Sequence, residues 1–445
     1  MKNIPQFLIA APTSGAGKTT VSRGLMALLV SMGKTVQPYK CGPDYIDTKY
    51  HTAVCGRSSV NLDTFMASEE HVRELYACYA KDADALVVEG MMGMYDGYER
   101  DKGSSAEIAR LLDIPVVLVV DAKSAAYSMA PLLKGFMTFR DDVQIAGVIF
   151  NKVGSPRHFS MLQEVCEELG LTCFGYVPKQ KELEQNSRYL GLDFSQMGGD
   201  DSLNQLVKTL KQHIDVKLLL KRVMRPVPKC PRGGAKKAGT WNILVASNEE
   251  SFSFLYKEHL DILRTLGKVK YFNPELNKAF PKKVDLVYLP GGYPEKHAER
   301  LSRAEKTLNA LRDYVEAGGR VLAECGGLIY LSQGLVYDSS PTSFSVCPLA
   351  GIFNVYISMR KVDRKLSLGY RRFEYGGQTL RGHEFHYTQY MQPEGGDMLM
   401  PPSVAKVYDA RGNLTKTPVF RYKNVIASYT HLYWGEIDVK QLFER

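Results

Sequence analysis

The sequence predicts an α/β protein with two domains, and three observations support this. Residues 1–215 alternate short apolar runs, rich in β-branched residues, with amphipathic stretches. This pattern is typical of parallel strands that are covered by helices on both faces. Residues 241–445 begin a second series of the same kind. The 445 residues also exceed what one hydrophobic core usually holds.

The expected elements of the first domain follow one another at regular intervals. We expect strands at 6–11, 35–40, 85–90, 115–122, 145–152 and 173–178, and helices at 19–33 and 157–170. In the second domain we expect strands at 241–247, 284–289, 320–324 and 424–430. Residues 216–240 are basic, contain three prolines and have no clear period. We interpret them as a linker.

Composition restricts the class of protein. Apolar residues make up 44% and charged residues 24%, which is ordinary for a globular protein. No stretch approaches the roughly 20 apolar residues of a membrane span, and no cleavable signal pattern is visible, so we expect a cytoplasmic protein. The net charge of +9 permits an acidic partner. Because no nucleic-acid-binding motif accompanies it, a small polyanion is favoured.

The eight cysteines show no metal-binding or redox spacing. They form no C-x-x-C pair and no His/Cys cluster with zinc spacing. We therefore expect most of them to be small core residues without a chemical role.

The stretch "APTSGAGKTT" (11–20) indicates a nucleotide-binding loop. It follows an expected strand and precedes an expected helix, so its backbone amides and the helix N-terminus can bind phosphate. The strict pattern G-x-x-x-x-G-K-[ST] is not met, because Pro12 occupies the first glycine position. The alternative is a glycine-rich turn with an incidental lysine. The candidate nucleotide ligands are Thr13, Ser14, Gly15, Gly17, Lys18, Thr19 and Thr20.

Carboxylates close to this loop are candidates for a magnesium site. Glu89 ends an expected buried strand, and Asp96 follows seven residues later. Asp44 and Asp47 lie in the turn "KCGPDYID". Since Mg²⁺ prefers one or two carboxylates with phosphate oxygens and water, we assign Thr19, Asp44 and Glu89 to the metal. Each carboxylate alone could equally be a solvated cap.

Asn151 ends another expected strand in "GVIFNKVG". In GTPases, an N-K-x-D motif recognises the guanine base through its aspartate. This chain has Gly154 at the position of that aspartate. Asn151 is therefore a candidate ligand of an adenine nucleotide rather than a guanine nucleotide.

The stretch "AECGG" (323–327) indicates a nucleophile on a strand–turn–helix corner. Cys325 has small neighbours on both sides, as such a corner requires. We expect the following helix N-terminus to lower its thiol pKa. His431 follows a late strand and is a candidate base, and the backbone amides of Gly291 and Gly292 are candidates for the oxyanion site. The alternative is a buried structural cysteine and an unrelated histidine. We do not assign His383 and His386 to a metal site, and packing or substrate contact is the preferred interpretation.

Taken together, these motifs resemble one family, the cobyrinic acid a,c-diamide synthases, over nearly the whole chain. Residues 1–215 resemble a dethiobiotin-synthetase-like, P-loop amide-forming domain in "APTSGAGKT", "KCGPDYID", "VVEGMMGMYDG" and "VVLVVDAKSAA". Residues 241–445 resemble a class I glutamine amidotransferase α/β domain of the cobyric acid synthase subtype. The shared segments there are "FSFLY", "LPGGYPE", "AECGGLIYL", "GYRR", "RGHEFHY" and "ASYTHLYW".

The resemblance implies a ligase that uses ATP, Mg²⁺ and glutamine. Cys325 would attack glutamine with His431 as base, and Tyr433 stands where ordinary class I enzymes have a glutamate, so a Cys–His dyad is expected. ATP would activate a substrate carboxylate, and ammonia would convert it to an amide within one chain that holds both sites. The resemblance further implies that Asp44, Asp96 and Arg188 meet the substrate.

The implied substrate is a corrinoid polycarboxylate amidated at its a- and c-acetate groups in cobalamin biosynthesis. Arg57, Arg188 and Arg371 are candidate carboxylate clamps. The family segment "RHLGL" reads "RYLGL" here, so Tyr189 leaves the substrate open. Hydrogenobyrinic acid or nickel-sirohydrochlorin are alternatives, as is a ParA-like ATPase with a silent second domain. We expect neither a nucleic acid nor a membrane as a partner. The sequence leaves open whether the chain forms a homodimer.

Overall fold

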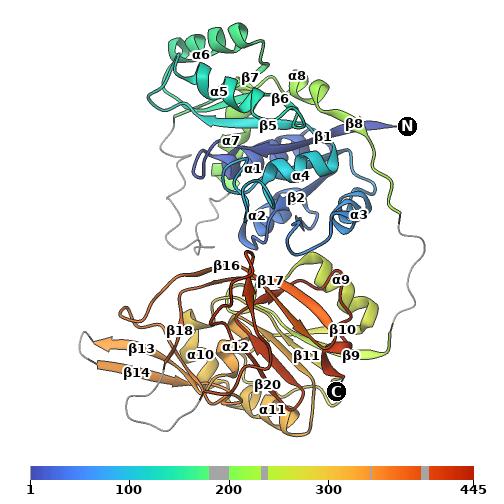
Figure 1. Cartoon of the computed structure of the whole chain (residues 1–445), viewed down its shortest axis with the longest axis vertical. Coiled ribbons are helices and arrows are strands. Elements are labelled where there is room, and N and C mark those ends of the chain that lie inside the picture. The colour runs from blue at the N-terminus through green and yellow to red at the C-terminus, as the bar shows by residue number, and fades with distance from the viewer. Residues whose placement is uncertain (1, 180–199, 232–238, 341–342, 392–399, 445) are drawn as a thin grey trace. The chain divides into compact units, whose positions relative to one another are not determined.

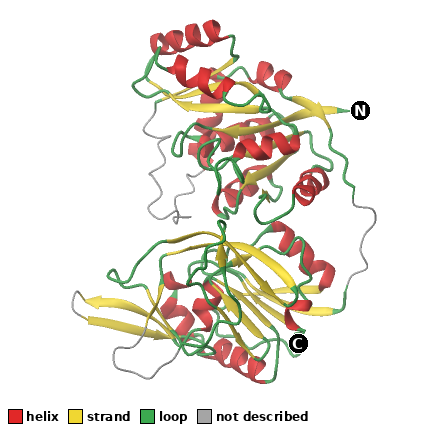
Figure 2. Ribbon diagram, viewed as in Figure 1, coloured by secondary structure: helices red, strands yellow, loops and turns green. Residues whose placement is uncertain are grey.

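The computed structural model describes residues 2–179, 200–231, 239–340, 343–391 and 400–444. The chain divides into two compact units, shown in Figure 1. Unit 1 comprises Met1–Thr64 and Ser68–Gly233, and unit 2 comprises Phe65–Ala67 and Gly234–Arg445. Both units mix helices and strands (Figure 2), so the predicted α/β class with two domains is confirmed.

Unit 1 contains an eight-stranded sheet in which seven strands run parallel in the order β3-β2-β4-β1-β5-β6-β7. The short β8 pairs antiparallel with the start of β1. Their bounds are β1 Asn3–Ala10, β2 Val36–Cys41, β3 Val60–Leu62, β4 Ala85–Glu89, β5 Val116–Asp121, β6 Ile145–Val153, β7 Cys173–Pro178 and β8 Met224–Pro226. β1 lies between β4 and β5, where the strand order reverses, and ligands of such sheets bind at the carboxyl end of this position.

Helices connect these strands, and local capping explains where several of them begin. The side chains of Ser68, Ser104 and Ser155 accept hydrogen bonds from the first turns of α3, α4 and α6. The bounds are α1 Lys18–Ser31, α2 Ile46–Cys55, α3 Glu69–Tyr79, α4 Ser105–Leu112, α5 Met129–Thr138, α6 Pro156–Leu169, α7 Asp200–His213 and α8 Val216–Arg222. Gly24 allows α1 to approach α7, because a Cβ there would stand 2.5 Å from Leu210.

The stretch that we predicted as a linker, 216–240, is partly regular structure. α8 buries Leu219, and β8 continues the sheet at β1. The prolines misled the prediction, because an antiparallel edge strand such as β8 tolerates proline whereas a central strand does not.

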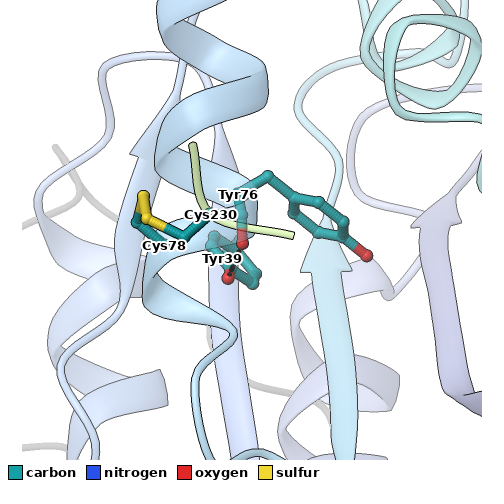
Figure 3. Close-up of a disulfide and its surroundings, with 4 residues drawn as sticks. All are labelled: Tyr39, Tyr76, Cys78 and Cys230. Atoms are coloured by element: carbon teal, nitrogen blue, oxygen red, sulfur yellow. Dashed lines mark hydrogen bonds between the residues drawn. A yellow bond between two sulfur atoms is a disulfide. The ribbon is translucent and has the colours of Figure 1, made fainter. Parts of the chain in front are cut away.

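A disulfide joins Cys78 on α3 to Cys230, which follows β8 (Figure 3). The two Cα atoms are 4.5 Å apart although 152 residues separate the cysteines in sequence. Next to it, the Tyr39 hydroxyl donates to the Tyr76 carbonyl (2.6 Å), and the Tyr76 hydroxyl donates to Gln6 on β1 (2.9 Å). The sequence spacing did not predict this pairing, and these two cysteines are exceptions to the expectation that most of the eight are small core residues.

Unit 2 has one mainly parallel six-stranded sheet and two four-stranded sheets among its described residues. The large sheet has the order β10-β9-β11-β12-β21-β20, with β20 antiparallel. Its strands are β9 Trp241–Ala246, β10 Gly267–Phe272, β11 Leu286–Leu289, β12 Val321–Glu324, β20 Val419–Tyr422 and β21 Val425–Ser428. The four predicted strands of this domain are all present.

The smaller sheets have the orders β14-β13-β15-β18 and β19-β16-β17-β22. Their strands are β13 Gly334–Ser340, β14 Ser343–Pro348, β15 Tyr356–Ser358, β16 Ser367–Tyr375, β17 Gln378–His386, β18 Gln389–Met391, β19 Tyr408–Asp409 and β22 His431–Leu432. Helical segments of the unit are α9 Lys257–Leu266, η3 Pro294–Lys296, α10 Ala298–Arg303, α11 Glu305–Glu316, α12 Gly326–Leu331 and η4 Gln441–Phe443. β17 pairs with β22 and so brings His383 opposite His431.

Candidate active site

The candidate nucleotide loop lies where the sequence predicted it, between β1 and α1. Gly15 (φ 77°) and Gly17 (φ 102°) adopt the left-handed conformation that favours glycine. A Cβ at Gly17 would stand 2.1 Å from Asn151 Nδ2, and that nitrogen donates to the Ala16 carbonyl (2.8 Å). Asn151, at the end of β6, therefore contacts the loop itself.

Lys18 and Thr19 begin α1 and point to the same buried cluster. The Lys18 ammonium donates to the Met92 carbonyl, and burial followed by the charge of Lys40 lowers its pKa to about 8. The Thr19 hydroxyl donates to Glu89 Oε1 (2.8 Å). Asp96 also acts electrostatically on Lys18. The structure thus brings Lys18, Thr19, Glu89 and Asp96 to one place.

Glu89 is fully buried at the end of β4 and lies at the centre of this cluster. Lys40 Nζ contacts Glu89 Oε1 (3.0 Å) and Asp47 Oδ2 (2.8 Å), and His51 Nε2 contacts Glu89 Oε2 (2.7 Å). Burial disfavours the charged form of Glu89. Lys40 and His51 stabilise that form more strongly, and so they hold the Glu89 pKa well below its usual value. Sequence reasoning missed Lys40 and His51, since nothing in a strand lysine or a helix histidine indicates a shared buried partner.

The predicted metal ligands fit Mg²⁺ in part. Thr19 Oγ1 and Glu89 Oε1 are 2.8 Å apart, close to the ~3.0 Å edge of an octahedron with bonds of about 2.1 Å. Asp44 Oδ1 instead accepts from the backbone amides of Ile46 (2.6 Å) and Asp47 (2.9 Å) at the start of α2. Among the described residues, no group of three or more His, Cys, Asp or Glu side chains forms a metal cage. A bound Mg²⁺ would therefore depend on phosphate oxygens and water beside Thr19 and Glu89.

Two of the candidate carboxylate clamps have other partners in the structure. The Arg57 guanidinium donates to Gln37 and to the carbonyls of Tyr79 and Lys81. The Arg371 guanidinium forms an ion pair with Glu384 (2.6 Å). Both guanidinium groups thus help to hold the fold together, and their role as clamps stays a prediction. Arg188 and Tyr189 lie outside the described residues.

The thiol site in unit 2 starts from the corner between β12 and α12. Cys325 has φ 47° and ψ −101°, a conformation unfavourable for a residue with a side chain. Its amide donates to the Ser428 carbonyl at the end of the neighbouring β21 (2.8 Å), and three residues later the chain reaches His431. Both Cys325 and His431 are almost fully buried.

The loop after β11 lies directly against this corner. A Cβ on Gly291 would stand 2.2 Å from His431 Cε1, and one on Gly326 would stand 3.0 Å from the Gly292 amide nitrogen. The structure therefore brings together Cys325, His431 and the two candidate oxyanion glycines.

Protonation of this pair differs from what we expected. Burial, followed by the charge of Glu295, raises the Cys325 pKa well above its usual value. Burial, followed by His383, lowers the His431 pKa well below its usual value. The expectation that the helix N-terminus lowers the thiol pKa was wrong, because α12 has only six residues and the thiol is buried among acidic groups. Both shifts favour the neutral forms of the pair, a thiol and an imidazole.

Aromatic rings lie next to this histidine, and the two residues that follow Leu432 bind acidic side chains. The His383 ring stacks on the His431 ring (4.9 Å between centroids), and the Tyr433 hydroxyl donates to Glu258 on α9. Trp434 Nε1 donates to Glu324 Oε1 (3.1 Å), directly before the nucleophile. Burial raises the Glu324 pKa to about 8. Tyr433 thus occupies the position where a third acidic residue would stand, and its own acidic partner comes from elsewhere in the chain.

Two family models match the chain, one in each unit. The CobQ/CobB/MinD/ParA nucleotide binding domain matches residues 7–191, and the CobB/CobQ-like glutamine amidotransferase domain matches residues 243–438. The cobyrinate a,c-diamide synthase of Caldanaerobacter subterraneus subsp. tengcongensis is 38% identical over 99% of this chain and 98% of its own length. The chain belongs to the a,c-diamide synthase family.

Further relatives in this family carry a different substrate in their names. The hydrogenobyrinate a,c-diamide synthase of Brucella abortus is 38% identical over 96% of this chain and 98% of its own length. That of Streptomyces coelicolor is 33% identical over 97% of this chain and 95% of its own. The chain is thus an amide-forming ligase of the a,c-diamide synthase family. Similarity over both units favours this over a ParA-like ATPase with a silent second domain.

Among the helices that the structure describes, none combines the length and apolar character that a membrane span requires.

Proposed function

We propose that this ligase amidates the a- and c-acetate carboxylates of cobyrinic acid, with ATP as the activating nucleotide and glutamine as the nitrogen source. One observation carries the proposal: a buried cysteine–histidine pair and a phosphate-binding loop with an adjoining acidic cluster occur in one chain. The first suits ammonia release, and the second suits carboxylate activation. Hydrogenobyrinic acid and nickel-sirohydrochlorin remain the alternative substrates.

In unit 2, Cys325 attacks the side-chain amide of glutamine and His431 accepts the thiol proton. The neutral imidazole is suited to this step, because it can accept a proton and then return it to the leaving ammonia. The Gly291 and Gly292 amides stabilise the oxyanion. Water then hydrolyses the thioester and releases glutamate.

In unit 1, the phosphate loop holds ATP through residues 13–20, and Lys18 stabilises the phosphoryl group as it moves to the substrate carboxylate. Ammonia displaces phosphate from the acyl phosphate to give the amide. Mg²⁺, held beside Thr19 and Glu89, would neutralise charge on the phosphates. Exclusion of water protects the acyl phosphate from hydrolysis. We further propose that the enzyme acts in the cytoplasm.

Product mass tests the substrate assignment. The enzyme is incubated with ATP, Mg²⁺, glutamine and each of the three tetrapyrrole acids in separate reactions. Two successive amidations of cobyrinic acid that stop at the diamide are the expected result. Amidation of another acid, with cobyrinic acid unchanged, would refute the assignment.

A variant tests the division of labour between the units. Cys325→Ala should lose glutamine-dependent synthesis and retain synthesis from high concentrations of ammonium salt. Equal loss with both nitrogen donors would contradict separate sites for ammonia release and amide formation.

A further inference from the structure

Glu295 is an acidic residue next to the nucleophile to which the chemistry above gives no role. It lies in η3, three residues after Gly292 of the Gly291–Gly292 loop. That loop packs on the nucleophile corner, since a Cβ on Gly326 would stand 2.9 Å from Pro294 Cδ. The charge of Glu295 acts on the Cys325 thiol more strongly than that of any other side chain.

The two other carboxylates that act on the thiol already have partners. Glu324 accepts hydrogen bonds from Tyr288 (2.9 Å) and Trp434 (3.1 Å). Glu384 is paired with the Arg371 guanidinium (2.6 Å). Each is therefore compensated within the protein.

Glu295 differs from both, because its carboxylate forms no ion pair in the part of the chain that the structure describes. Its Oε2 atom is buried and has no hydrogen-bond partner there. Glu384 Oε1 also has no hydrogen-bond partner, but the other oxygen of Glu384 is paired with Arg371. Three cationic side chains have charges that reach Glu295. Lys296 lies over the Tyr293 ring (5.0 Å to its centroid), His297 contacts Glu250 (2.7 Å) and Arg364 donates to the Met359 carbonyl (2.9 Å). A buried carboxylate oxygen without a partner is costly, and a cationic ligand group would offset this cost.

Glutamine carries such a group at one end and the reacting amide at the other. Resting on the proposed function, we propose that the Glu295 carboxylate binds the α-ammonium group of glutamine while Cys325 attacks its side-chain amide. The carboxylate then selects for an α-amino acid.

This pairing also links substrate binding to activation of the nucleophile. Without glutamine, Glu295 and Glu384 oppose formation of the thiolate when they are ionised, and burial raises the Glu295 pKa to about 7. The arriving ammonium neutralises Glu295 and so removes the largest of these charge effects. Cys325 becomes more reactive only when its substrate is bound, which protects the thiol from side reactions.

The test compares two substrates in two variants. One substrate is glutamine, and its hydrolysis is measured as glutamate formation. The other is glutaramic acid, which lacks the α-amino group, and its hydrolysis is measured as glutarate formation. Glu295→Gln keeps the shape of the side chain and removes its charge. The matched control is Glu299→Gln on α10, a carboxylate whose side chain is 68% exposed and pairs only with the exposed Arg303.

Wild-type enzyme and Glu299→Gln should prefer glutamine strongly. Glu295→Gln should lose roughly 30-fold or more in kcat/KM for glutamine, the range for a broken buried charge pair, and little for glutaramic acid. Equal loss on both substrates would overturn the proposal, because a merely structural role affects both alike. If wild-type enzyme released no ammonia from glutamine, the proposed function itself would fail, which is a separate outcome.

A second measurement needs no substrate. Alkylation of Cys325 by the neutral reagent iodoacetamide, followed by mass spectrometry of its peptide, reports thiolate formation. Glu295→Gln should be alkylated faster than wild type at the same pH, and Glu299→Gln at the wild-type rate. An unchanged rate in Glu295→Gln would contradict an electrostatic effect of Glu295 on the thiol.

Discussion

Gly291 allows His431 to occupy its place beside the nucleophile, and Gly291→Ala should therefore disable ammonia release alone. The added Cβ would stand 2.2 Å from His431 Cε1 and 2.9 Å from Nδ1. Carbon atoms normally approach to about 3.5–4.0 Å, so the imidazole would have to move by more than about 1 Å. It has little room, because the His383 ring stacks on it (4.9 Å) and the Phe254 ring lies nearby (5.9 Å).

A displacement of this size costs on the order of 10²-fold in rate when it affects a positioned catalytic group. We expect glutamine-dependent synthesis by Gly291→Ala to fall by about that factor, and ammonium-dependent synthesis to stay near wild type. The assay is initial-rate amidation with each nitrogen donor. Gly135→Ala on α5 is the control, because a Cβ there has no atom within 4 Å. Retention of full glutamine-dependent activity in Gly291→Ala would refute the role given to the position of His431.

Three further predictions concern the phosphate loop, the thiol and the disulfide. Lys18→Ala should lower the rate of synthesis with both nitrogen donors by on the order of 10²-fold or more, while glutamine hydrolysis survives. Amide formation measures the synthesis, and glutamate formation measures the hydrolysis. A normal rate of synthesis would refute the loop assignment. In the resting enzyme, the rate of Cys325 alkylation should keep rising as the pH passes 9.0, the usual pKa of a thiol. Burial raises the Cys325 pKa, and the reactive thiolate forms only above that pKa. A rate that reaches a plateau below pH 9 would contradict this. Reduction of the Cys78–Cys230 disulfide should lower the unfolding free energy by at most about 5 kcal/mol, since the disulfide closes a loop across 152 residues. Denaturant unfolding with and without reductant measures this change, with Cys78→Ser as a reference. An identical unfolding midpoint in both conditions would refute a stabilising role.

The order of elements and the two sharp turns that carry Lys18 and Cys325 were predictable from sequence because they depend on short-range patterns. Apolar runs in β1, β4 and β12 identify buried strands, and small residues after them identify sharp turns. Lys18 and Cys325 each lie directly after such a turn, so their roles could be inferred from a few neighbouring residues. The prediction of a linker over the residues of β8 was wrong because it considered only local sequence. The pairing of β8 with β1 joins residues more than 200 positions apart.

The sequence by itself therefore determined the α/β class and the two domains, and it located the glycine-rich loop after β1 and the candidate pair Cys325 and His431. Only the tertiary structure decided the charges around them. The Lys40–Glu89–His51 cluster, the disulfide and the environment of Cys325 join side chains from distant segments, and their energies depend on burial and on distances of a few ångströms. Local sequence predicted a thiol pKa lowered by a helix end. Burial beside Glu295 raises it instead, because desolvation and a nearby negative charge outweigh the short helix.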